Sequence, residues 1–405
     1  MSENRPLTFL CLASHFKGEP FMQAVKQLGH HVILVAAEKY KDDSWPRESI
    51  DEIFFMPSLS RRPDITHAVS YLARGRQIDT LIALDDFDVE TAAHLRDHMR
   101  LPGLSESQAR NFRDKLAMRT TARAGGVLVP EFVGVFNYDR LREFMARVPP
   151  PWVLKPRSEA SSMGIKKLHD AEQLWRALDT LGDQQSFFLL EQFVPGEVFH
   201  VDALVDNGQV LFVNANQYAR PPMSVYQDGG VFATHNLDRR SALAQELFEM
   251  NARTLKALGM VRGANHAEFI KANADGRVYF LECAARVGGA NIAEATEYAT
   301  GVNLWREWAR IEEAHLRGRP YQLPERRANY CGIIQCLARE AWPDTSAYTD
   351  PEIVWRLKKK QHVGLIISSP DASRVEALIN QYTERFTQDF LAVAPPLESV
   401  TQMDH

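Results

Sequence analysis

The sequence predicts an α/β protein that opens with a parallel-sheet, Rossmann-like domain. Strand-like and helix-like segments alternate over the first hundred residues, which is typical of βαβ units and a parallel sheet. Proline and glycine breaks follow at residues 102–103 and 149–151, and a region of strands and turns with interspersed helices extends to about residue 300. A smaller α/β pattern occupies residues 325–405.

The expected N-terminal elements alternate in a regular order. We expect strands at Leu7–Ala13, His31–Ala37, Ile53–Met56 and Ile78–Leu84, and helices at Pro20–Leu28, Asp64–Arg74 and Val89–Met99. Ligands of open α/β sheets bind beyond the carboxyl ends of the strands, here residues 14–18 and 85–86. Neither segment has the glycine pattern of a phosphate-binding loop.

The later elements are fewer. One helix is expected over Ser105–Ala124, ended by Gly125 and Gly126. The C-terminal unit should contain strands at Gly332–Ala338 and His362–Ser368 and a helix at Ala372–Phe386.

Bulk composition excludes several classes of protein. The 405 residues carry 47 basic and 52 acidic side chains, a formal charge of −5, so nothing favours nucleic acid or an anionic membrane. No apolar run reaches the roughly 20 residues needed to cross a bilayer. The four cysteines have neither CxxC nor zinc spacing and are expected to be buried thiols. The expected location is the cytoplasm.

A lysine follows an apolar strand at Trp152–Lys155, just before a proline. A small-residue loop with Ser161, Ser162 and Gly164 leads into a second short strand. Backbone N–H groups of such a hairpin can surround phosphate oxygens, and Lys155 adds a point charge. Taken alone, this segment is more often a plain surface turn.

A second candidate segment is Glu191-Gln192-Phe193-Val194, followed by a Pro-Gly turn and Glu197. A purine needs an apolar slot with a backbone donor and acceptor at one edge, and a linker between two lobes supplies both. Glu197 is then close enough to accept ribose hydroxyls. A surface turn with solvated acids explains the segment equally well.

The strongest local pattern is a hairpin around Asp275-Gly276. A register symmetric about Asp275 pairs Glu268 with Glu282, Ile270 with Phe280 and Ala272 with Val278. The two carboxylates would then be cross-strand neighbours, roughly 5 Å apart at Cβ. A hard divalent cation removes the repulsion between them, and magnesium favours such carboxylates together with substrate phosphates. A solvent-facing acidic pair is the alternative.

Arg286 follows the second carboxylate by four residues, and a helix is expected to begin after Gly288-Gly289. Arginine binds carboxylate or phosphate in bidentate fashion, and a helix N-terminus attracts anions. Acyl phosphate chemistry needs such groups beside the metal.

In this order, the segments resemble the ATP-grasp superfamily. The resemblance covers about 200 residues, from Asp114-Lys115 through Lys155 to Glu268, Glu282 and Arg286. It implies an N-terminal α/β domain at residues 1–104, an ATP-grasp domain at 105–320 with a nucleotide lid at about 125–195, and a C-terminal subdomain at 321–405.

The resemblance also implies roles for these residues. Lys115 and Lys155 would contact ATP phosphates, and Arg286 would anchor the acyl phosphate or the substrate carboxylate. Magnesium, or manganese in its place, would bind Glu268 and Glu282. The adenine hinge would be Glu191, Gln192, Phe193 and Val194, and Glu197 would hold the ribose.

One position departs from the family pattern, because Ala284 stands where relatives often have a metal-binding asparagine. We therefore expect an ADP-forming carboxylate–amine ligase acting on an amino acid or similar carboxylate and a small-molecule nucleophile. The alternatives are a biotin-carboxylase-like enzyme with a separate carrier and a non-catalytic ATP-binding protein. Many relatives are dimers, but no apolar stripe here requires one.

Two secondary hypotheses concern other polar residues. Ser14, His15, Lys17, Asp85 and Asp86 at the strand ends are candidates for the acceptor pocket, although loop caps are the commoner reading. His235, in a glycine-opened strand, is expected to be structural.

Overall fold

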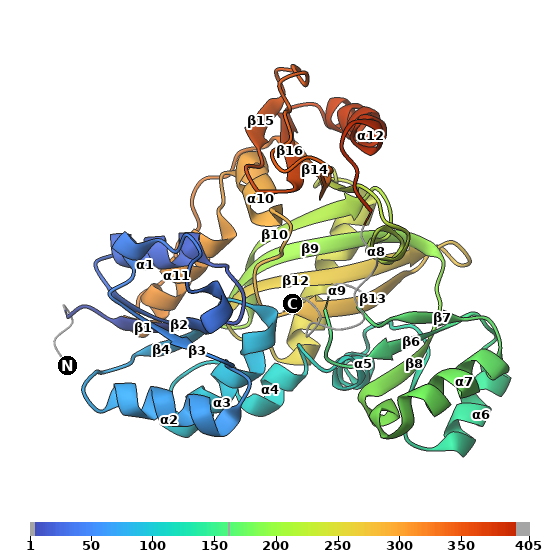
Figure 1. Cartoon of the computed structure of the whole chain (residues 1–405), viewed down its shortest axis with the longest axis horizontal. Coiled ribbons are helices and arrows are strands. Elements are labelled where there is room, and N and C mark those ends of the chain that lie inside the picture. Colours follow the sequence, from blue (N-terminus) through green and yellow to red (C-terminus); the bar gives the residue numbers. More distant parts are fainter. Residues whose placement is uncertain (1–4, 161–162, 394–405) are drawn as a thin grey trace.

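The computed structural model describes residues 5–160 and 163–393, and within them three sheets form the frame of the molecule (Figure 1). The first sheet has four parallel strands in the order β3-β2-β1-β4. The second has eight antiparallel strands, β13-β12-β9-β10-β11-β14-β16-β15, and the third has four, β5-β8-β6-β7. The predicted α/β class with an N-terminal parallel sheet is confirmed.

The N-terminal sheet follows the predicted alternation closely. Its strands are β1 (Thr8–Ala13), β2 (His31–Ala37), β3 (Glu52–Met56) and β4 (Thr80–Ala83), and its helices are α1 (Glu19–Gln27), α2 (Arg62–Ala73) and α3 (Val89–Met99). β1 reads as a continuous apolar run because helices and loops bury both faces of a parallel sheet. Its carboxyl end and that of β4 point toward the rest of the chain.

The helix expected over Ser105–Ala124 is wrong as one element. The segment forms two helices, α4 (Glu106–Arg110) and α5 (Lys115–Ala124). Asp114 between them has an extended backbone, and its Oδ1 accepts from the N–H groups of Leu116 and Ala117. An aspartate cap competes with helix continuation, and here it restarts the helix at Lys115.

The third sheet forms a lobe with two helices on one face. Leu141 and Phe144 of α6 and Leu174 and Leu178 of α7 share an apolar core with the inward residues of the sheet. The elements are β5 (Phe132–Gly134), α6 (Tyr138–Arg147), β6 (Trp152–Pro156), β7 (Lys166–Leu168), α7 (Ala171–Leu181) and β8 (Phe188–Gln192). The antiparallel pairing of β6 with β7 confirms the predicted hairpin.

The eight-stranded sheet spans the centre and the C-terminal unit. Its strands are β9 (Gly196–Asp206), β10 (Gln209–Tyr218), β11 (Phe232–Asn236), β12 (Gly263–Ala272), β13 (Val278–Ala284), β14 (Tyr330–Leu337), β15 (Ile353–Arg356) and β16 (His362–Ser369). The accompanying helices are α8 (Pro222–Asp228), α9 (Ala242–Leu258), α10 (Ile292–Thr300), α11 (Leu304–Leu316) and α12 (Ala372–Asp389). Because β14 pairs with β11, the C-terminal strands extend the central sheet.

Two further expectations concern the chain as a whole. All four cysteines are free and buried, as predicted, and burial raises the pKa of each thiol. Over the described residues, no helix combines the length and the apolar character needed to cross a membrane.

Candidate functional site

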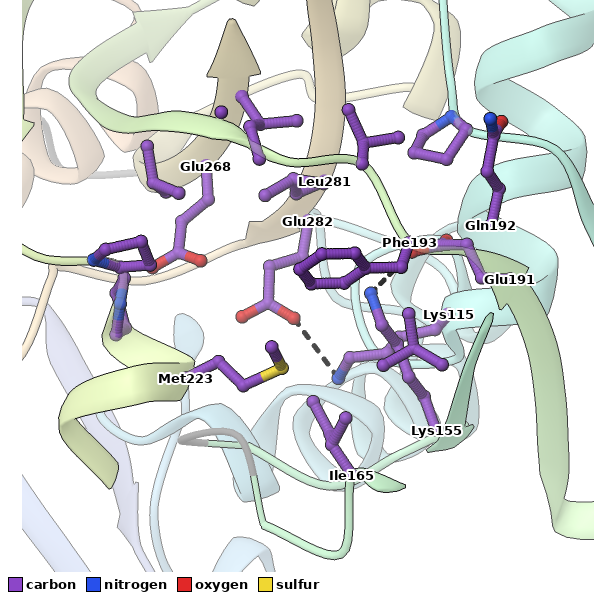
Figure 2. A pocket seen from close by; sticks show the side chains of 18 of the residues that line it. Lys115, Lys155, Ile165, Glu191, Gln192, Phe193, Met223, Glu268, Leu281 and Glu282 are labelled. Atoms are coloured by element: carbon purple, nitrogen blue, oxygen red, sulfur yellow. Dashed lines mark hydrogen bonds and ion pairs between the residues drawn. The ribbon is translucent and has the colours of Figure 1, made fainter. Parts of the chain in front are cut away.

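A cavity of about 290 Å³ lies between the third sheet and the β9–β12–β13 part of the central sheet (Figure 2). The predicted residues that line it are Lys115, Lys155, Glu191, Gln192, Phe193, Val194, Glu268 and Glu282. They come from α5, β6, β8, β12, β13 and the link from β8 to β9, so the fold brings together segments up to 167 residues apart. Ser161 and Ser162 lie outside the described residues.

Lys155 is fixed by a buried ion pair on the third sheet. Its Nζ lies 2.5 Å from Glu191 Oε1, and Arg119 Nε lies 2.6 Å from the other carboxylate oxygen. Burial by itself would raise the pKa of Glu191, but Arg119 and Lys155 outweigh it and lower that pKa to about 2. Glu191 is buried, and each of its carboxylate oxygens binds one cation.

Within the described residues, one backbone N–H group of the predicted hinge donates no hydrogen bond. The N–H groups of Gln192 and Phe193 already donate to the carbonyls of Glu131 and Pro151. Glu191 N–H belongs to the paired strand β8, which leaves Val194 N–H as the donor of the predicted hinge. Glu197 is exposed and absent from the cavity wall, and its Oε1 accepts from Gln217 at 2.9 Å.

Lys115 connects the third sheet to the carboxylate hairpin. As the first residue of α5, it places Nζ 3.2 Å from Glu282 Oε2 and 2.6 Å from the carbonyl of Glu159 (Figure 2). Burial raises the pKa of Glu282, but the charges of Lys115 and Lys155 reverse the shift, so the pKa is lowered. Glu282 is thus ionised at neutral pH.

The hairpin register is right at the carboxylates and wrong beyond them. Glu268 pairs with Glu282, as predicted. A bulge next to this pair then shifts the register, so that Phe280 faces Phe269, and Ile270 faces Tyr279. The predicted pairing of Ala272 with Val278 fails for the same reason, since Val278 faces Lys271. A bulge puts one extra residue in one strand, which a symmetric hairpin model cannot anticipate.

The carboxylate pair fits a hard divalent cation. Glu268 and Glu282 line the same cavity, and Tyr218 fixes Glu268 by donating its hydroxyl to Oε1 at 2.8 Å. Two carboxylates beside a cavity that also holds two lysines are what magnesium with phosphate ligands needs. Ala284, two residues after Glu282, is buried and offers no ligand atom.

Arg286 lies in a smaller, adjoining cavity of about 30 Å³. This cavity shares Lys115 and Glu282 with the larger one and also contains Asp86 and His266. Burial lowers the pKa of Arg286, but the neighbouring carboxylates, Asp86 first, make the net shift upward. Its buried Nε has no hydrogen-bond partner within the part of the chain that is described.

Only one residue of the N-terminal strand ends lines either cavity. Asp86 does so, with Oδ2 2.8 Å from Arg113 Nη1 and 3.9 Å from Arg286 Nη2. Asp85 instead pairs with Lys17 and His15, and Ser14 donates to Asp88. The loop residues other than Asp86 therefore bind one another, which matches the loop-cap reading.

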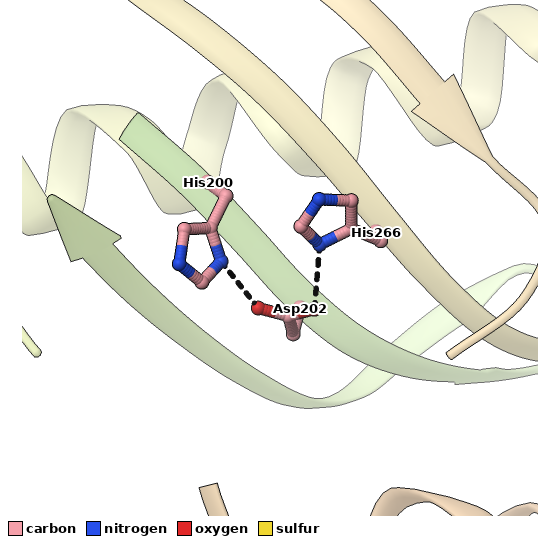
Figure 3. A group of neighbouring side chains, drawn as sticks. All are labelled: His200, Asp202 and His266. Atoms are coloured by element: carbon pink, nitrogen blue, oxygen red, sulfur yellow. Dashed lines mark hydrogen bonds and ion pairs between the residues drawn. The ribbon is translucent and has the colours of Figure 1, made fainter. Parts of the chain in front are cut away.

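A cluster of three residues, His200, Asp202 and His266, adjoins the carboxylate pair (Figure 3). The Asp202 oxygens lie 2.7 Å from His200 Nδ1 and 2.9 Å from His266 Nδ1. Although burial lowers the pKa of His266, Asp202 and Glu268 raise it to about 9. His266 is thus a cation at neutral pH, with Nε2 3.7 Å from Glu268 Oε1.

This cluster was not predicted from the sequence. The available signal was weak: residues 200 and 202 are two apart on a strand and so share a face, and residue 266 lies two before Glu268. His235, the histidine that was considered, lies on β11 opposite Gly332, outside both cavity walls.

The chain is similar to several known proteins. Residues 148–294 match the family model of the ATP-grasp domain. The match runs from just before β6 into α10. It is 24% identical over 234 residues to an L-arginine-specific L-amino acid ligase of Bacillus subtilis, with 56% of each chain covered. A D-alanine–D-alanine ligase of Neisseria gonorrhoeae is 23% identical over 47% of this chain and 64% of its own.

Structural similarity extends over more of the chain. The crystal structure of an L-amino acid ligase from Bacillus licheniformis superimposes with a TM-score of 0.76 at 16% identity, covering 96% of this chain and 99% of that one. The sequence matches, by contrast, span only about half to two thirds of the curated relatives' length.

Proposed function

We propose that this protein is an ATP-dependent ligase that forms ADP. It would activate a small carboxylate, in our preferred case an amino acid, as an acyl phosphate and join it to an amine or another nucleophile. The observation that carries the proposal is the meeting of Lys115, Lys155, Glu268 and Glu282 in one cavity, beside a second cavity that contains Arg286.

The roles follow from position and charge. Lys115 and Lys155 hold the phosphates of ATP, and the link from Gln192 to Val194 takes the adenine. Glu268 and Glu282 hold magnesium, which when bound neutralises phosphate charge. The larger cavity is thus assigned to the nucleotide and its metal.

The reaction would occur where the two cavities meet. A substrate carboxylate oxygen attacks the γ-phosphorus, and the bond from that phosphorus to the β–γ bridging oxygen breaks, releasing ADP. The nucleophile then attacks the acyl carbon and phosphate leaves. The protein contributes mainly positioning and charge neutralisation.

An amino-acid substrate is supported by the charges around the smaller cavity. Arg286 suits a carboxylate or an acyl phosphate, and Asp86 lies in the same cavity, where it can accept an ammonium group. The relatives named above are themselves amino-acid ligases. Residues 105–320 would form the ATP-grasp domain between a domain at 1–104 and a subdomain at 321–405.

An ADP-release assay over a panel of amino acids, singly and in pairs, tests the proposal. Release that requires an amino acid supports the ligase. Release only with bicarbonate and biotin would contradict it and favour a carboxylase.

A second candidate, an ATP-binding protein without turnover, is motivated by Ala284. It predicts tight ATP binding by calorimetry and no ADP release with any acceptor. The same panel, combined with a titration of ATP, therefore separates all three functions.

A further inference from the structure

A separate cavity of about 220 Å³ lies where the edge of the N-terminal sheet meets the central sheet. Its walls come from β4, from the segment after α3, from the start of β12 and from α11. It shares no lining residue with either cavity of the candidate site. None of the roles proposed above uses it.

Among the residues that line this cavity, two arginines, Arg96 and Arg262, face one carboxylate, Glu312. Asp97 and Asp206 act on Arg96 and His315 from outside the lining. His315 adds no charge at neutral pH, because burial and the nearby Arg262 lower its pKa below the ordinary value. A bound monoanion would balance the charges of the lining itself.

Arg262 is the residue best placed to bind that anion. Its side chain is only 5% exposed, and its Nε donates to Glu312 Oε2 at 2.8 Å. The other oxygen of Glu312 accepts from Trp308 Nε1 at 3.1 Å. No acceptor is found within residues 5–160 and 163–393 for the two Nη groups of Arg262. Paired guanidinium N–H groups match a carboxylate.

Arg96 binds the backbone of the cavity wall rather than the proposed anion. Its Nε and Nη2 donate to the carbonyl of Leu81, at 3.0 and 2.6 Å, and so satisfy the exposed side of β4, the edge strand of its sheet. Burial lowers the pKa of Arg96 to about 10. The guanidinium remains charged at pH 7, with the charges of Glu312 and Asp97 acting against the effect of burial.

The rest of the wall is apolar and defines the body of the ligand. Leu81, Val89, Leu104, Met260 and Trp308 all line the cavity and are at most 8% exposed. The volume is below the roughly 300–1,000 Å³ typical of sites for drug-sized ligands. A small molecule with an apolar group and one carboxylate fits both the charge and the wall.

We infer that this cavity is a second ligand site that binds a small monocarboxylate carrying an apolar group. Ala285 lines this second ligand site, whereas its neighbours Ala284 and Arg286 line the smaller cavity of the candidate functional site. The second cavity therefore adjoins the segment that carries Arg286. The site is independent of the proposed ligase activity.

Benzoate is a suitable probe, used with the full chain saturated with MgADP so that the nucleotide cavity is filled. We expect saturable binding by calorimetry and a change in tryptophan fluorescence that is lost in Trp308→Phe. Arg262→Gln should weaken binding about tenfold or more, as expected for a charge-assisted hydrogen bond. Arg253→Gln, which changes an exposed arginine on α9, should leave binding unchanged.

Two further variants make the test decisive. Ala83→Leu adds bulk to the β4 wall of the cavity and leaves both residues of the Arg262–Glu312 ion pair in place, so it should abolish binding. This holds even if Arg262→Gln folds poorly, and thermal unfolding monitors folding in both variants. Arg286→Gln should still bind benzoate. Absence of saturable binding, or binding that Arg286→Gln removes and Arg262→Gln retains, would overturn the inference.

Discussion

The two charged walls of the larger cavity of the candidate site have opposite charge balances. On the third sheet, one carboxylate, Glu191, faces two cations, Arg119 and Lys155. On the hairpin, there are two carboxylates, Glu282, which pairs with Lys115, and Glu268, which lies beside His266. Adding the pair formed by Asp202 and the cationic His266 does not change the balance on the hairpin.

The difference indicates which ligand each wall accepts. The first wall has one positive charge in excess and is held rigidly by a buried carboxylate, so it suits phosphate. The second wall has one negative charge in excess, which a divalent cation reverses. A nucleoside triphosphate together with its metal ion complements both walls at once.

The largest expected effect comes from removing charge from the hairpin wall. Glu282→Gln should lower the rate of ADP formation by at least about a hundredfold, because a hard metal ligand is lost while the shape of the side chain is kept. Steady-state kinetics would measure this, with Glu246→Gln, an exposed glutamate on α9, as the control. Turnover near the wild-type rate would show that Glu282 is not a metal ligand.

The next effect tests whether the other wall is a rigid scaffold. Glu191→Gln leaves Arg119 and Lys155 buried without a counter-charge, which should reduce the free energy of unfolding by about 3–5 kcal/mol. Denaturant unfolding of this variant and of Glu172→Gln, an exposed change in the same lobe, measures the difference. Equal stability of the two variants would contradict a structural role for the pair.

The lowered pKa of Glu191 also predicts that the free energy of unfolding depends on pH. Because the pKa of Glu191 is lowered from its ordinary 4.5 to about 2, its contribution to stability is complete above about pH 4.5 and is lost as the pH falls toward 2. Urea unfolding from pH 6 down to pH 3 should therefore show a steeper loss of stability in the wild type than in Glu191→Gln. Parallel profiles would exclude this contribution.

A smaller effect is expected at Lys155. Lys155→Ala removes one phosphate contact and should weaken ATP binding about tenfold to a hundredfold by calorimetry, while Arg119 still neutralises Glu191. Lys256→Ala, on the exposed face of α9, is the control. If ATP affinity is unchanged while stability drops, Lys155 is structural only.

Sequence patterns predicted which elements form the walls of the cavity better than they predicted the strand register and the side-chain contacts within them. Apolar alternation located the N-terminal strands. A hairpin symmetric about Asp275 placed Glu268 opposite Glu282, a pairing that in the structure depends on the bulge between this pair and the turn. The bulge beyond that pair and the break at Asp114 depend on local backbone geometry that periodicity does not encode. The contacts of Glu191 with Arg119 join residues 72 positions apart, which one sequence cannot reveal.

The smallest predicted effect concerns Ala284, the position where the hairpin wall lacks a ligand. Ala284→Asn adds an amide oxygen beside Glu282, so a magnesium ion would gain a ligand. The magnesium concentration at half-saturation should therefore be a few fold lower than in the wild type. Titrating magnesium at a fixed ADP concentration and recording thermal stabilisation measures this without relying on turnover, and Ala284→Leu controls for side-chain size. If both variants bind magnesium less well, the wall is complete without a third ligand, and Glu268 and Glu282 with phosphate oxygens hold the metal on their own.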